Sequence, residues 1–168
     1  MENKLIEFFV SRTAKICFSV CAILPVFVLI MDTFTMVSES GITVSFSAMS
    51  MMETYAKYGG SIGMWAAMLF TPIYRITFVL TLVLGAAAIG VSFIRKKWAS
   101  ILTYIFATIP TLALSMCLGA LTSFAEEEGI AYSMVLFVAI MWTALIDTAT
   151  LTGFVCSLVS KKYEYYYS

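Results

Sequence analysis

Four long apolar stretches, each bounded by polar or charged residues, dominate the pattern along this chain. They cover residues 16–31, 73–94, 99–121 and 132–160. A helix rises by about 1.5 Å per residue, so about 20 apolar residues cross a hydrocarbon core of ~30 Å. The pattern therefore predicts an all-α polytopic membrane protein, a bundle of four transmembrane helices.

A different pattern occupies the connection between the first two stretches. Ile42, Val44 and Phe46 alternate with polar residues, which is the two-residue period of a half-buried strand. Residues 34–38 are a suitable partner strand, and the Glu-Ser-Gly sequence at 39–41 favours a turn. We expect a small β-hairpin here. Two strands alone are marginally stable in water, so their apolar face must rest on the helices, the membrane surface or another protein.

The remaining segments complete a single membrane domain over residues 1–168. We expect an interfacial segment at 1–15, a loop at 32–72 that carries the hairpin and a short helix, an acidic loop at 122–131, and an aromatic tail at 161–168. Pro72 is expected to lie at the start of the second span, and Pro110 lies inside the third. No small-x-small cleavage pattern follows the first apolar stretch, so we expect it to remain as a span.

Basic residues fall mainly on one side of the predicted spans. That side holds Lys4, Arg12, Lys15, Arg95, Lys96, Lys97, Lys161 and Lys162. Only Lys57 and Arg75 fall on or near the other side, which carries most of the acidic residues. Because Lys and Arg accumulate in cytoplasmic segments, we expect both termini in the cytoplasm and the hairpin on the extracytoplasmic face of the plasma (inner) membrane.

Composition supports a membrane protein with little soluble mass. The 168 residues are 61% hydrophobic and 12% charged, with a mean hydropathy of +0.96, whereas a soluble domain is about a quarter charged. The net charge of zero gives no reason to expect a nucleic-acid partner. The compact size, the absence of N-glycosylation sequons and cysteine-free external loops favour a bacterial inner membrane.

The chain offers little material for catalysis or for binding a metal or cofactor. Histidine is absent, which removes Ser-His and Cys-His pairs, imidazole ligands and imidazole proton relays. The four cysteines lie in apolar stretches, where a thiol behaves as a small apolar group. No glycine-rich phosphate loop is present. We therefore expect a non-enzymatic protein with no cofactor and no metal.

The predicted topology is similar in plan to that of the claudin-like tetraspan proteins. Residues 63–65, Gly-Met-Trp, resemble their Gly-Leu-Trp element. The cysteines that follow this element in that family are absent here, and the loop after Trp65 is too short for the family's remaining strands. The resemblance extends to topology only, and it implies no activity or partner for this chain.

Asp147 is the only formal charge placed deep in a predicted span, where a carboxylate is costly and usually functional. Three roles are open to it. It can be a structural group held by Thr143 and Thr150, one turn away on the same helix face. It can pair with Arg75, although the two lie about 21 Å and about 30 Å from the inner interface. It can also bind and release a proton or cation during transport.

These observations lead to two functional hypotheses. The first is an interaction or accessory protein, such as a scaffold, a complex subunit or an immunity-type protein. Its hairpin would recognise a membrane or extracytoplasmic protein, or a second copy of the chain, through Ile42, Val44 and Phe46. The alternative is a small oligomeric channel, or a transporter coupled to protons or cations, that uses Asp147.

Overall fold

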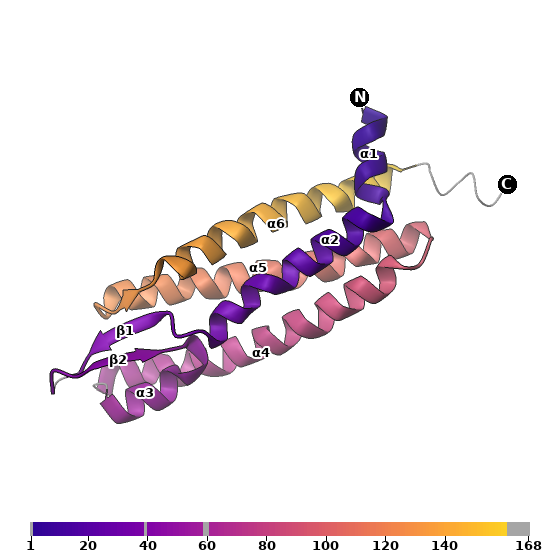
Figure 1. Cartoon of the computed structure of the whole chain (residues 1–168). Coiled ribbons are helices and arrows are strands. Elements are labelled where there is room, and N and C mark those ends of the chain that lie inside the picture. Colours follow the sequence, from indigo (N-terminus) through magenta and orange to yellow (C-terminus); the bar gives the residue numbers. More distant parts are fainter. Residues whose placement is uncertain (1, 39, 59–60, 161–168) are drawn as a thin grey trace. The chain divides into compact units, whose positions relative to one another are not determined.

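A computed structural model describes residues 2–38, 40–58 and 61–160 (Figure 1). The elements in order are α1 Glu2–Val10, α2 Arg12–Ile23, the 3-10 helix η1 Leu24–Ile30, β1 Phe34–Val37, β2 Thr43–Phe46, the 3-10 turn η2 Ala48–Ser50, α3 Met51–Tyr58, α4 Ser61–Ser92, α5 Lys97–Glu127, β3 Ala131–Tyr132 and α6 Met134–Val159. Glu39 in the predicted turn and the predicted aromatic tail, 161–168, lie outside the described residues.

Within the part of the chain that the structure describes, four helical segments are long and apolar enough to cross a membrane. They are Arg12–Ile30, Met64–Ser92, Lys97–Glu127 and Met134–Val159. This confirms the prediction of four long apolar helices, and by length and composition it indicates a multi-pass membrane protein.

Two helices extend further than the hydrophobic pattern predicts. Helix α4 begins at Ser61 rather than at residue 73, so Pro72 lies inside the helix instead of at its start. A proline removes one backbone N–H, and an apolar helix tolerates this when its neighbours compensate for the lost bond. Helix α5 continues to Glu127, so the first part of the predicted acidic loop is helical. The sequence misplaces the start of α4 because Pro72 suits a helix start, and it misplaces the end of α5 because the last residues of that helix are polar.

The chain folds into two compact units. Unit 1 comprises Met1–Leu24, Leu80–Leu112 and Thr143–Ser168, and unit 2 comprises Pro25–Val79 and Ala113–Trp142. Helices α4, α5 and α6 each contribute residues to both. Unit 1 contains Asp147, and unit 2 contains the strands.

The predicted hairpin is present in unit 2, and it belongs to a three-stranded antiparallel sheet. Strand β1 pairs with β2 from Phe34 opposite Phe46 to Val37 opposite Thr43. The connection between α5 and α6 adds β3 on the other side of β1, which gives the order β2-β1-β3. If the four long helices cross a membrane, this pairing puts both connections on the same side of it.

Candidate functional site

A chain of aromatic rings anchors the sheet to the helices of unit 2. Neighbouring ring centroids along it lie 5.7 to 6.3 Å apart. The order is Phe34, Phe46, Tyr55, Phe124, Phe70 and Tyr74, from β1, β2, α3, α5 and α4. Offset and edge-on aromatic pairs each add about 0.5–1.5 kcal/mol beyond area burial. The apolar face of the hairpin therefore rests on helices of its own chain.

The three residues predicted to form a recognition surface have different environments. Ile42, just before β2, is 56% exposed. Val44 is half-buried on the inner face of the sheet. Phe46 is only 2% exposed and stacks on Phe34. Phe46 is thus a core residue that a partner cannot contact, because a period-2 pattern identifies the apolar face but not what covers it.

The outer edge of β2 is unpaired among the described residues, since β1 pairs with both β2 and β3. The amide of Ser38 donates to the carbonyl of Ile42 at 2.8 Å, which fixes the alternation of bonded pairs along the hairpin. By that alternation, Val44 bonds to β1, and the backbone groups of Thr43 and Ser45 point away from it. Two N–H and two C=O groups therefore lie along this edge, beside exposed side chains.

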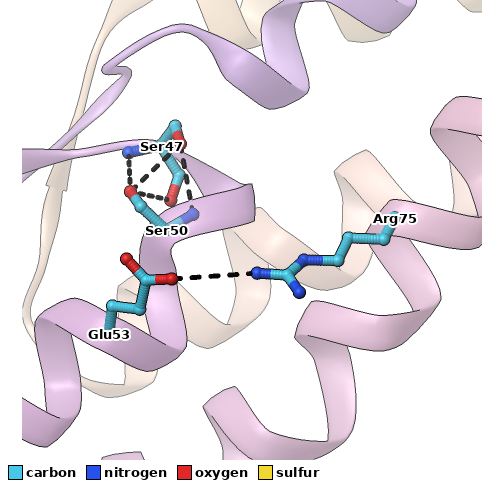
Figure 2. Close-up of polar contacts among 4 residues, drawn as sticks. All are labelled: Ser47, Ser50, Glu53 and Arg75. Atoms are coloured by element: carbon cyan, nitrogen blue, oxygen red, sulfur yellow. Dashed lines mark hydrogen bonds and ion pairs between the residues drawn. The ribbon is translucent and has the colours of Figure 1, made fainter.

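The segment that follows the hairpin is held by a capping box and an ion pair, both shown in Figure 2. The hydroxyl of Ser47 accepts from the amide of Ser50, and the hydroxyl of Ser50 accepts from the amide of Ser47. Glu53 on α3 lies 4.0 Å from the guanidinium of Arg75 on α4. The partner of Arg75 in this ion pair is thus Glu53, and not Asp147 as one of the three hypotheses had it. Both side chains are exposed, so this pair contributes little to stability.

The connection between α5 and α6 carries a second polar contact of unit 2. Tyr132 on β3 donates from its hydroxyl to a carboxylate oxygen of Glu126, at 2.9 Å. This hydrogen bond, with the negative charge of Glu126, raises the pKa of the Tyr132 phenol above its ordinary value. The contact ties β3 to the end of α5. The sequence placed Tyr132 at the start of the fourth span, because two strand residues are too few to show a period.

In unit 1, α5 and α6 meet along a line of small and polar residues. Ser100 and Ser157 join their hydroxyls at 2.9 Å. Four residues further along α5 and four back along α6, the ring of Tyr104 lies against Gly153 so closely that a Cβ there would overlap it. This opposite progression is the signature of antiparallel helices. The polar line, defined as these residues with Thr111 and Asp147, lets the two backbones approach closely.

Asp147 lies on this polar line, with 7% of its surface exposed. The hydroxyl of Thr111 on α5 donates to its carboxylate. Thr150 donates to the backbone carbonyl of Asp147 at 3.2 Å, and Thr143 is fully buried one turn earlier on α6. Of the predicted partners, Thr150 therefore bonds to the backbone of Asp147, and the carboxylate accepts from Thr111 on the neighbouring helix.

Thr111 could have been identified from its spacing. It follows Ser100, Tyr104 and Thr108 on one helical face of the third span. That face alone does not say which helix it meets, and the partner helix is decided by tertiary packing.

The described residues offer no cluster of side chains that could bind a metal ion. Within residues 2–38, 40–58 and 61–160, no three His, Cys, Asp or Glu side chains lie close enough together to hold a metal ion. The four cysteines are free thiols. Two places among the described residues have the geometry that bears on function: the free edge of β2 and the surroundings of Asp147.

Comparison of the chain with protein-family models, with curated proteins and with solved structures finds no match.

Proposed function

We propose that this chain is a non-enzymatic membrane interaction protein that recognises a partner protein by strand addition to the outer edge of β2. The observation that carries the proposal is the set of outward N–H and C=O groups of Thr43 and Ser45 on a sheet that the aromatic chain fixes to the helices. An anchored edge loses little conformational entropy when a strand pairs with it.

The chemistry of the edge specifies the kind of strand that fits. Thr43 and Ser45 present short hydroxyl side chains on the outer face of the sheet. Ile42 and Val37 lie exposed near the hairpin tip, where they add apolar contact. A partner segment with small polar residues opposite β2 and an apolar residue near the tip complements this surface. In this proposal the recognition surface no longer includes Phe46, because that side chain is buried.

The basic-residue distribution gives the setting of this interaction. We place both termini in the cytoplasm and the sheet on the extracytoplasmic side of a bacterial plasma membrane. The pairing of β1 with β3 supports one common side for the two connections that carry strands. The partner is then a membrane protein or an extracytoplasmic protein, and a second copy of this chain is distinguished by the mass of the complex.

A matched pair of substitutions at position 45 tests the proposal. Ser45→Pro removes an N–H that points to the free edge and leaves the bonds to β1 intact, since edge strands tolerate such a proline. Ser45→Ala removes the hydroxyl and keeps the N–H. We expect the proline variant to weaken the complex at least about tenfold, measured as intact complex in mild detergent, and the alanine variant to retain it.

Thermal unfolding of both variants serves as the control, and the melting temperature should change little in either. A complex that survives Ser45→Pro unchanged shows that the partner binds elsewhere. Loss of the complex in both variants would assign recognition to the hydroxyl and not to the backbone.

A second candidate function rests on Asp147, a buried carboxylate beside the buried hydroxyls of Thr111, Thr143 and Thr150. Ionisable residues within membrane segments commonly mark the path of a proton or cation. Asp147→Asn keeps the shape and an acceptor oxygen but cannot exchange a proton. Under this alternative it abolishes ion flux in liposomes, whereas under the interaction proposal no Asp147-dependent flux exists.

A further inference from the structure

The first helix of the chain is separated by a single residue from the apolar segment that follows it. Helix α1 ends at Val10 and α2 begins at Arg12, and Ser11 between them has the extended dihedral angles φ −64° and ψ 147°. Both helices belong to unit 1. An extended residue between two helices changes the direction of the chain, and Figure 1 shows α1 turned away from the line of α2. The predicted interfacial segment at 1–15 thus contains a break, and α1 lies outside the apolar segment Arg12–Ile30.

One side of α1, which we call the packed side, is held against unit 1. Val10 is buried, and the ring of Phe9 stacks on that of Phe18 from α2, with the two centroids 5.4 Å apart. The hydroxyl of Tyr104 on α5 donates to the backbone carbonyl of Phe9. Because these contacts come from two other helices of the unit, they fix which face of α1 points away from the protein.

Beside the packed side, α1 carries two large apolar side chains that the described residues leave uncovered. Leu5 is 54% exposed and Phe8 is 57% exposed. They lie three residues apart, so they form one patch on the surface of the helix. At about 100° per residue, this patch lies between the packed side and the exposed charged residues Lys4 and Glu7. An apolar arc next to a charged arc is the arrangement of a helix that lies in a membrane surface.

We propose that the patch of Leu5 and Phe8 inserts between the headgroups and acyl chains of a lipid bilayer, so that α1 lies along the membrane surface. The apolar segment Arg12–Ile30 begins one residue after α1, so the turn at Ser11 lies near the surface when that segment crosses a bilayer. A helix that turns at this depth either projects into water or lies on the surface, and only the second arrangement covers the patch with lipid. The inference requires that Arg12–Ile30 crosses a membrane, and it is independent of recognition by β2.

Spin labelling of the full chain in phosphatidylcholine nanodiscs tests this proposal. A nitroxide is attached to Leu5→Cys, to Phe8→Cys or, as the matched control, to Glu7→Cys. Each is combined with Cys17→Ser, because Cys17 is an exposed thiol, and labelling of Cys17→Ser alone gives the background. We expect the labels at positions 5 and 8 to collide more often with oxygen, which concentrates in lipid, than with a water-soluble nickel chelate, as suits side chains about 5–10 Å into the bilayer surface. The label at position 7 should show the reverse order.

Hydrogen exchange gives a second readout that needs no label. In the same nanodiscs, the amides of residues 4–10 should exchange at least about tenfold faster in the double variant Leu5→Ser, Phe8→Ser than in the wild type, because the loss of lipid contacts lets α1 open more often. Glu7→Gln, on the charged side of the helix, should leave this exchange unchanged. The amides of α5 should exchange alike in all three proteins, which shows that the long helices remain folded.

Three results would overturn the proposal. Equal access of the nickel chelate to positions 5, 7 and 8 would show that α1 projects into water. Dipolar broadening between the position-5 labels of two molecules, with both reagents excluded, would assign the patch to a second copy of this chain. Unchanged hydrogen exchange in the double variant would show that the contacts of Phe9 and Val10 hold α1 in place without the bilayer.

Discussion

The hydrogen bond between Thr111 and Asp147 gives the sharpest test of how α5 and α6 are held together. Thr111 has a single hydroxyl hydrogen and three acceptors in reach. These are the carboxylate of Asp147, the carbonyl of Ala107 at 3.0 Å and the carbonyl of Thr108 at 2.9 Å. When Asp147 is removed, Thr111 still bonds within its own helix. The interhelical bond is therefore weaker than its burial suggests.

A double-mutant cycle of Thr111→Val and Asp147→Ala measures this bond. Interhelical hydrogen bonds in membrane proteins average about 0.6 kcal/mol, with the strongest near about 1.7 kcal/mol. Because the hydroxyl of Thr111 has alternatives, we expect a coupling free energy of about 0.5–1.5 kcal/mol. The assay is reversible unfolding in mixed micelles, with the free energy of unfolding compared across the four proteins.

Asp147→Asn is the matched control, since it keeps an oxygen that Thr111 can donate to. We expect it to cost less than Asp147→Ala and to retain part of the coupling. A coupling indistinguishable from zero would show that Thr111 does not hold the carboxylate in the folded protein. A coupling above about 3 kcal/mol would indicate a tightly held buried charge, which the available alternatives for Thr111 do not explain.

Three other substitutions test packing and protonation. Gly153→Ala should destabilise the protein by about 1–3 kcal/mol, because the added methyl group overlaps the ring of Tyr104, whose hydroxyl donates to the carbonyl of Phe9. Gly119→Ala, where the added methyl group meets open space, should be neutral or stabilising. Equal effects of the two substitutions on the free energy of unfolding would contradict this packing. Tyr74→Phe should be neutral or stabilising by up to about 1 kcal/mol, because the buried Tyr74 hydroxyl has no partner among the described residues. A clear decrease in the free energy of unfolding would reveal a hydrogen bond to that hydroxyl. Burial, with the charge of Glu128 adding to it, raises the pKa of Tyr55 from 10.0 to about 12. The folded state therefore favours the neutral phenol, so the stability that this group contributes is complete below pH 10 and is lost as the pH rises towards 12. In an ultraviolet titration, Tyr55→Phe should show one late-ionising tyrosine fewer than the wild type.

The sequence by itself determined the class of the long helices and of the hairpin. Apolar runs of membrane-spanning length predicted four long helices, and the structure has them, because the cost of burying backbone polar groups in lipid makes a long apolar run helical. The alternation around Val44 predicted a strand, because successive strand side chains point to opposite faces. These are local regularities, so a single sequence reveals them.

Only the tertiary structure decided which residues meet. Phe46 is in the core because its ring packs against Phe34 and Tyr55. Arg75 forms its ion pair with Glu53, and the carboxylate of Asp147 accepts a hydrogen bond from Thr111. Each of these contacts joins different helices or strands, and such a contact leaves no repeating pattern in the sequence. Each depends on how the helices and strands pack. The pairing of β3 with β1 has the same origin, since two residues become a strand only because a partner strand lies beside them.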